Sequence, residues 1–253
     1  MLTYELLHKD RIVARIDTSG RCEVLEEPFM PYGLVLEDTR DLSTSGCFPK
    51  AWVRENEGFS LYKDGDVQAV ENELLASRIL RCFELRQVLY ERGCFDGQSV
   101  SVSRIFTGPD YGICTWEQFQ IYAVNHDIDP WVFCLALDPV NYYRMNVVDY
   151  LIGNTDRHWG NWGFLIDNTT NWPVSLHPLM DFNQSFHRYD SLDGSNALTV
   201  PKRGMSQREA AVEGAREAGP GRNVQVPEKL FDGRTQQYEM FCRRLEIVEN
   251  AVV

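Results

Sequence analysis

The chain has 253 residues, of which 43% are hydrophobic and 25% charged, and its formal net charge is −12 at pH 7. Such a composition supports a buried core and excludes disorder along the whole length. The negative charge disfavours direct binding to nucleic acid, whose phosphates attract a positive surface. No apolar run reaches the ~20 residues of a membrane helix, and the first residues do not resemble a secretory signal. We therefore expect a cytoplasmic protein that binds no membrane.

Strand patterns dominate the first part of the chain. Residues 11–16 and 33–37 are rich in β-formers, and residues 51–54 and 59–63 flank a turn-like segment, as in a hairpin. Residues 99–106 alternate between apolar and polar side chains, which predicts another strand.

Helical patterns follow, with apolar residues three or four positions apart. They predict helices over residues 71–86, 115–125, 130–137, 140–152 and 235–250. Gly153 suits the position just past a helix end. Two short strands are expected at 162–166 and 172–176. Residues 205–227 hold few large apolar side chains, which favours a mobile loop or a loosely attached helix.

Strands followed by helices predict an α+β fold with two lobes. We expect a small β-rich N-lobe over residues 1–108 and a mainly helical C-lobe over residues 109–253. The seven cysteines are scattered and include no Cys-x-x-Cys pair. Small, mostly buried free thiols are therefore expected, without a disulfide framework or a zinc site.

The densest chemical pattern is an Asp followed five residues later by an Asn, with a second Asp after a predicted hairpin. These residues are Asp156, Asn161 and Asp181. Phosphoryl transfer needs a carboxylate near the attacking hydroxyl and oxygen ligands for Mg²⁺. Asp156 would be the base, and Asn161 and Asp181 the metal ligands.

These residues lie in segments that resemble HipA-family protein kinases. Residues 154–161, Asn-Thr-Asp-Arg-His-Trp-Gly-Asn, are similar to the catalytic loop of that family, and residues 180–183, Met-Asp-Phe-Asn, to its metal-binding element. Upstream, residues 43–50 are similar to the family's Ser-x-x-Gly-x-x-x-Lys nucleotide loop. Residues 59–63 resemble its lysine strand, and residues 71–73 open the helix behind it.

The resemblance implies a kinase-like fold and Ser/Thr protein kinase activity with ATP and Mg²⁺. It implies that Lys63 contacts the nucleotide phosphates and pairs with Glu73. It further implies a nucleotide loop, with autophosphorylation at Ser43 or Ser45. The residues expected at the nucleotide, beyond Lys63 and Glu73, are Ser43, Ser45, Gly46, Lys50 and Phe106.

The chain also departs from the family pattern. Typical members are longer and carry an N-terminal domain that contacts a DNA-binding antitoxin, whereas here only a short segment precedes Ser43. A role as a bacterial toxin, with a small antitoxin-like partner protein, therefore stays open, as does the protein substrate. Asn183 stands where conventional kinases have Gly.

Ordinary structural roles compete with each functional one. Asp156 could cap a helix or a turn, and His158 is expected to make a structural hydrogen bond. Lys63 could be a surface lysine, and Glu71 competes with Glu73. Residues 43–46 could form a plain polar turn. The tryptophans at 159, 162 and 172 are expected to pack in the core or between the lobes rather than to stack on bases.

Other functions also stay open. A metal-dependent phosphohydrolase could use Asp156, His158, His177 and Asp181. A pseudokinase could keep the fold and sequester a partner. A kinase of the same mechanism could act on a lipid or small-molecule hydroxyl, because the acceptor is selected outside these motifs.

Overall fold

The structure is a computed structural model that describes residues 3–8, 11–17, 22–24, 49–55 and 58–252. Its first strands form an antiparallel sheet of β1 (Thr3–His8), β2 (Arg11–Asp17) and β3 (Cys22–Val24). β2 confirms the strand expected at 11–16, whereas β1 and β3 were not predicted. The strand expected at 33–37 and the loop residues Ser43, Ser45 and Gly46 lie outside the described residues.

A second antiparallel sheet, in the order β4-β5-β7-β6, carries the lysine strand. The hairpin is confirmed as β4 (Lys50–Glu55) and β5 (Gly58–Lys63), and the strand at 99–106 as β7 (Gln98–Arg104). β6 (Tyr90–Phe95) was not predicted, because its polar and glycine residues do not alternate like those of a half-buried strand.

Helix α1 (Val67–Leu80) packs against β6 and β7. It begins earlier than expected because the Asp66 side chain accepts a hydrogen bond from the N–H of Ala69. It also ends earlier, because the following residues pair with distant segments: the N–H of Glu84 donates to the carbonyl of Gly221. Cys82 and Phe83 are buried as the periodicity suggested, but they lie beyond the helix.

The next helices match their expected positions. They are α2 (Trp116–Asn125), α3 (Pro130–Leu137) and α4 (Pro139–Ile152), each with a capping side chain at its N-terminus. Gly153 ends α4 in the left-handed conformation, as predicted.

A third sheet, in the order β10-β9-β8, lies beside α2. β9 (Gly163–Asp167) and β10 (Trp172–Leu176) confirm the two expected short strands, and β8 (Tyr111–Thr115) was not predicted. Gly163 has a φ of 155°, and a Cβ there would lie 2.2 Å from the carbonyl oxygen of Cys114. Only glycine allows this close approach between β8 and β9.

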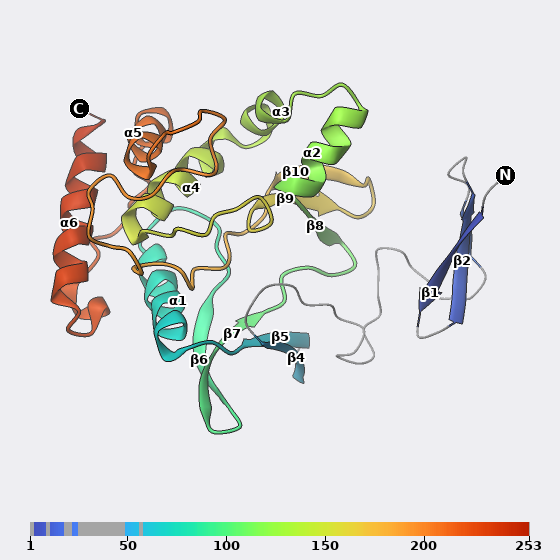
Figure 1. Ribbon diagram of the computed structural model, residues 1–253, viewed down its shortest axis with the longest axis horizontal. Helices are drawn as coiled ribbons and strands as arrows, with labels where there is room; N and C mark the ends of the chain where they lie inside the picture. Colours follow the sequence, from blue (N-terminus) through green and yellow to red (C-terminus); the bar gives the residue numbers. More distant parts are fainter. Residues whose placement is uncertain (1–2, 9–10, 18–21, 25–48, 56–57, 253) are drawn as a thin grey trace.

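The C-terminal helices α4, α5 (Gln207–Ala218) and α6 (Thr235–Asn250) gather at one end of the molecule (Figure 1). The short 3-10 helix η2 (Glu228–Phe231) contacts α6 and α1. α6 has the expected bounds, and Phe241, Leu245 and Val248 form its buried face.

The expectation of a mobile or loosely attached segment at 205–227 is wrong. α5 packs closely on α4 with small residues, and a Cβ at Gly214 would lie 2.6 Å from the carbonyl oxygen of Tyr143. Ala211 and Ala215 are fully buried in the same contact. Large apolar side chains are absent from this face because the two backbones leave no room for them.

An aromatic cluster forms the centre of the helical part. Trp116 and Trp162 stack with ring centroids 4.4 Å apart, and both are fully buried. Trp162 therefore has the expected core position, whereas Trp159 and Trp172 are 47% and 45% exposed. Five cysteines are free, and two of them, Cys94 and Cys242, are exposed, which corrects the expectation of mostly buried thiols.

The whole is an α+β fold with a β-rich N-terminal part and a helical C-terminal part, as predicted. The boundary proposed at residue 108 falls in the connection between β7 and β8 and stays a prediction. Within the described ranges, we find no helix with the length and apolar character needed to cross a membrane.

Candidate active site

The side chain of Lys63 lies between two carboxylates from different parts of the chain. Its Nζ is 3.0 Å from Oε1 of Glu73 and 2.6 Å from Oδ1 of Asp181. Lys63 ends β5, Glu73 lies on α1, and Asp181 follows β10. The expected contact between Lys63 and Glu73 is therefore present, and Lys63 is a buried residue rather than a surface lysine.

The competition between Glu71 and Glu73 is also settled by the geometry. Glu71 points to the neighbouring strand, where its Oε1 lies 2.6 Å from Nη1 of Arg92 on β6. Glu73 is 1% exposed and accepts hydrogen bonds from Lys63, from the hydroxyl of Ser101 and from the N–H of Phe182. Glu73 is thus the residue that joins α1 to both the lysine strand and the segment at Asp181.

One ammonium, that of Lys63, is shared by two carboxylates in this cluster. Burial lowers the pKa of Lys63, but Glu73 and Asp181 outweigh it and raise that pKa overall. Burial raises the pKa of Glu73. Burial also acts against the charge of Asp181, but Lys63 lowers the pKa of this carboxyl below its usual value. Asp181 is therefore an ionised carboxylate at neutral pH.

The backbone at Asp181 is in a conformation that side chains rarely adopt. Its φ is 59°, in the left-handed region, which is unfavourable for a residue with a Cβ. The surrounding structure holds it there: the N–H of Asp181 donates to Oη of Tyr90 at 3.1 Å, and the N–H of Phe182 donates to Glu73. Backbone strain held by buried partners is typical of functional sites.

The segment with Asp156 and Asn161 follows directly on α4. The left-handed Gly153 turns the chain out of the helix, and the N–H of Asn154 donates to the carbonyl of Asp149. The Asn154 side chain accepts from the N–H of Asp156, and Nδ2 of Asn161 donates to the carbonyl of Asp156 at 2.9 Å. These bonds fix the backbone on both sides of Asp156.

The Asp156 carboxylate itself is half-buried. Among the described contacts, no backbone N–H donates to this carboxylate, so the capping role has no support there. Burial raises the pKa of Asp156, with Asp181 adding to the effect and His158 opposing it. The charge of Asp181 thus acts on the Asp156 carboxyl.

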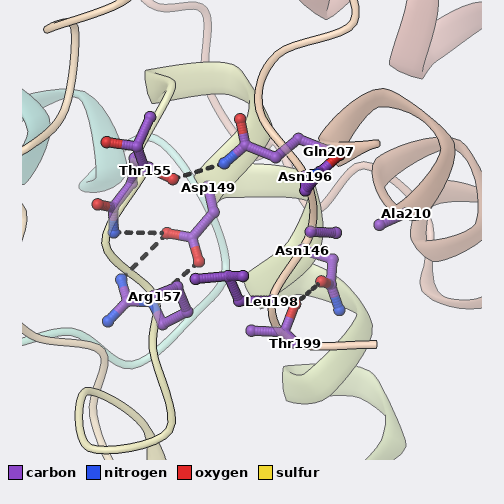
Figure 2. A pocket seen from close by; sticks show the side chains of 11 residues that line it. Asn146, Asp149, Thr155, Arg157, Asn196, Leu198, Thr199, Gln207 and Ala210 are labelled. Carbon is purple, nitrogen blue, oxygen red and sulfur yellow. Dashed lines mark hydrogen bonds and ion pairs between the residues drawn. The ribbon is translucent and has the colours of Figure 1, made fainter. Parts of the chain in front are cut away.

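Arg157 connects three segments of the chain. Its guanidinium forms a two-pronged ion pair with the Asp149 carboxylate, at 2.9 and 3.0 Å (Figure 2). Its Nη1 also donates to the carbonyl of Asn161 at 2.8 Å and to that of Met180 at 2.6 Å. The residue is 3% exposed. Helix α4, the Asn161 backbone and the residue before Asp181 are therefore held together by one side chain.

The remaining expected nucleotide residues are only partly described. Lys50 begins β4 and pairs across the sheet with Lys63, and its charge helps to lower the pKa of Asp181. Phe106 lies in the connection between β7 and β8, with its ring centroid 6.2 Å from that of His177. Ser43, Ser45 and Gly46 fall outside the described residues.

Within the described residues, His158 and His177 take part in no metal centre. Nδ1 of His158 accepts a hydrogen bond from the N–H of Gly160, which matches its expected structural role. His177 is buried, and its Nδ1 lies 2.7 Å from the carbonyl of Pro178. In the part of the chain that is described, no three His, Cys, Asp or Glu side chains converge as a metal site. The geometry therefore gives no support to the phosphohydrolase.

Several residues of the site could not be found from the sequence. Tyr90 and Ser101 reach Asp181 and Glu73 only through the pairing of β6, β7 and β5, which carries no local sequence signal. Asp149 lies one helical turn before the end of α4, and nothing in the sequence distinguishes it from other residues of that helix. Arg157 could have been noticed, because it immediately follows Asp156.

Comparison with known proteins supports the fold. No protein-family model and no curated protein matches the chain. Among solved structures, it is similar to the proinflammatory kinase CtkA of Helicobacter pylori, with a TM-score of 0.57, 14% identity, and coverage of 84% of this chain and 94% of that one. It is also similar to the Shewanella oneidensis HipA, solved with HipB and operator DNA.

The HipA likeness has a TM-score of 0.54 and 13% identity, and it covers 83% of this chain and 67% of that one. At such identities the two likenesses establish a shared fold. The chain therefore has the fold of the HipA and CtkA kinases, as its motifs predicted.

Proposed function

We propose that this protein transfers the terminal phosphoryl group of ATP to a Ser or Thr hydroxyl of a protein, in a reaction that depends on Mg²⁺. The observation that carries this proposal is the position of Lys63 between Glu73 and Asp181, within a kinase fold. A lysine paired with a helix glutamate, beside a metal-binding aspartate, is the arrangement that protein kinases use.

The residues present suit a magnesium nucleotide. Two carboxylates share Lys63, and Asp181 is the more exposed of the two. Asn161 uses its amide nitrogen to hold Asp156, which leaves the amide oxygen as a hard ligand. Bound Mg²⁺ would neutralise charge on the phosphates. Lys63 would bind the phosphates, and Asn161 and Asp181 would hold the metal.

Asp156 would orient the acceptor hydroxyl and accept its proton. Its backbone is fixed by Asn154 and Asn161, and its carboxylate is half-buried. Because burial raises its pKa, this carboxylate is a better base than an exposed aspartate. Asp181 has its pKa lowered by Lys63 and stays ionised for metal binding. The opposite shifts give the two aspartates different roles.

The finer parts of the proposal come from sequence motifs and likeness. Ser43, Ser45 and Gly46 would form the nucleotide loop, with Ser43 or Ser45 as the site of autophosphorylation, and Lys50 and Phe106 would lie at the nucleotide. The solved complex of HipA with HipB supports a small antitoxin-like partner and a toxin role. We place this activity in the cytoplasm.

The proposal is tested by incubating the purified protein with Mg-ATP and measuring its intact mass. We expect a gain of one or more phosphoryl groups in the native protein and at least a ~100-fold slower gain in Asp156→Asn, because the base is lost. Asp96→Asn, an exposed turn residue between β6 and β7, is the matched control and should react like the native protein. Ser43→Ala and Ser45→Ala locate the modified residue.

The outcomes also separate the alternative functions. Transfer by Asp156→Asn at the native rate would overturn the assignment of the base. Binding of Mg-ATP without any transfer to the protein or to added protein substrates would favour a pseudokinase. Transfer to a lipid or a small-molecule hydroxyl, but to no protein, would keep the mechanism and change the acceptor class.

A further inference from the structure

The peptide unit between Met180 and Asp181 is hydrogen-bonded at both ends by buried side chains. Its carbonyl accepts from Nη1 of Arg157 at 2.6 Å, and its N–H donates to Oη of Tyr90 at 3.1 Å. The two side chains come from distant parts of the sequence, one from β6 and the other from the segment after α4. They fix the plane of the peptide that immediately precedes the Asp181 side chain.

Tyr90 is itself held firmly. It begins β6, it is 8% exposed, and its N–H donates to the hydroxyl of Ser77 on α1. Its ring meets that of Phe182 edge to face, with centroids 6.0 Å apart. Burial raises the pKa of Tyr90 well above its usual value. Its neutral hydroxyl accepts the N–H of Asp181.

Arg157 holds the other end of the peptide and connects it to Asn161. The same Nη1 that donates to Met180 also donates to the carbonyl of Asn161, while the rest of the guanidinium is fixed by Asp149. A rotation of the Met180–Asp181 peptide would break both bonds at once. It would leave a carbonyl and an N–H without their partners in a partly buried place, which is costly.

We propose that Tyr90 and Arg157 are positioning residues that clamp the Met180–Asp181 peptide and keep the Asp181 carboxylate directed to the metal. This inference rests on the proposed function, in which Asp181 is a metal ligand. It explains why the strained backbone at Asp181 is held in place. The left-handed φ of 59° is unfavourable for a non-glycine residue, so Asp181 needs such partners to stay there. The clamp also fixes Asp181 relative to Asn161, the other proposed ligand.

Tyr90→Phe tests the clamp because it removes one hydroxyl and keeps the ring. The matched control is Tyr142→Phe, which also removes a buried hydroxyl, bonded to the carbonyl of Thr199 at 2.8 Å. For the full chain, we expect the Mg²⁺ concentration at half-maximal rate to rise about fivefold to tenfold in Tyr90→Phe, the effect of one lost hydrogen bond. The rate at saturating Mg²⁺ should change much less, and Tyr142→Phe should match the native protein.

A second readout does not depend on activity. The N–H of Asp181 loses its acceptor in Tyr90→Phe, so its hydrogen exchange, measured by NMR in the protein without nucleotide, should become about fivefold to tenfold faster than in Tyr142→Phe. Arg157→Lys removes the planar donor group and should weaken binding of Mg²⁺ with a non-hydrolysable ATP analogue, while binding of the analogue in EDTA changes little.

These measurements separate the two proposals. If the native protein fails to bind the analogue with Mg²⁺ but Asp181 exchanges faster in Tyr90→Phe, the clamp stands and the kinase function falls. If the native protein is an active kinase and Tyr90→Phe changes neither the Mg²⁺ dependence nor the exchange at Asp181, the clamp is refuted.

Discussion

Two buried ion clusters meet at the segment that carries Asp181, and they differ in the number of carboxylates that share the cation. In the first, Lys63 serves two carboxylates, those of Glu73 and Asp181. In the second, Arg157 pairs with the single carboxylate of Asp149 and also donates hydrogen bonds to two backbone carbonyls. The Lys63 ammonium is therefore shared between two carboxylates, whereas the Arg157 guanidinium has one carboxylate as its partner.

This difference distinguishes a cluster suited to a structural role from one that could also bind a metal cation. A matched, fully bonded ion pair holds segments together, and removing one partner leaves a buried charge that nothing compensates. A cluster in which two carboxylates share one cation loses less when one carboxylate is neutralised, because the cation keeps a partner. The two clusters should therefore respond differently to the same chemical change, from acid to amide.

The largest effect is expected from Asp149→Asn. This change leaves the Arg157 guanidinium, which is 3% exposed, without its counter-charge. We expect the free energy of unfolding to fall by about 3–5 kcal/mol, the usual cost of breaking a buried pair. Urea unfolding measures it, with Asp193→Asn, which breaks an exposed pair with Arg208, as the control. A loss no larger than in that control would show that Arg157 is held by the carbonyls alone.

The next effect concerns the pKa of His177. Because this residue also takes up a proton in acid, its contribution must be known before the two clusters are titrated. Burial lowers the pKa of His177 to about 4, below the ordinary 6.5. The unfolded chain binds the proton first, so stability falls as the pH drops from 6.5 towards 4. The loss is about 3 kcal/mol, at 1.36 kcal/mol for each pKa unit.

His177→Asn keeps a donor near the carbonyl of Pro178 but cannot titrate, so it should remove this part of the pH dependence. Urea unfolding at pH 7, 6 and 5 measures it. Equal slopes in the native protein and the variant would mean that His177 keeps an ordinary pKa in the folded state. The variant also gives a cleaner background for the acid titration of the two clusters.

The smallest effect on stability is expected from Glu73→Gln. Lys63 keeps Asp181 as its partner, so the free energy of unfolding should fall by only about 1 kcal/mol at neutral pH, the scale of one hydrogen bond. The pKa of Glu73 is raised in the folded state, so its contribution is present below pH 4.5 and lost as the pH rises through the folded pKa. The difference in the free energy of unfolding between the native protein and the variant should therefore be smaller at neutral pH than below pH 4.5.

Urea unfolding of Glu73→Gln beside Asp149→Asn puts the comparison to a direct test. Equal losses in the two variants would contradict the distinction between a cation with one carboxylate partner and a cation shared by two. Phosphoryl transfer should nevertheless fall in Glu73→Gln, because this carboxylate helps to position both Lys63 and the segment at Asp181. A small change in stability with a large change in rate is the expected signature.

The sequence predicted those elements whose signals are local. α6 has the expected bounds because its apolar face repeats regularly, and Gly153 was recognised because only few residues suit a left-handed helix end. β6 was missed because an edge strand with Glu91, Arg92 and Gly93 has no alternation. α5 was misjudged because close helix packing uses small residues, which look like a lack of core.

The residues of the site that lie in sequence motifs could be predicted. The residues that reach the site only through the pairing of distant strands could not. Lys63, Glu73 and Asp181 were expected to lie near one another, and they do. Tyr90 reaches Asp181 only because β6 pairs with β7 and α1 covers both. Such contacts depend on the pairing of distant segments, which no local pattern in this chain reveals.

Helix α5 has one further consequence. Its first residue, Gln207, donates from its side chain to the carbonyl of Asn154, two residues before Asp156. The stretch whose composition suggests a harmless place to insert an affinity tag or a fluorescent reporter is therefore attached to the segment that carries Asp156. An insertion near its start should disturb that segment even if the chain still folds, whereas the hairpin tip at Asp96 and Gly97 should accept one.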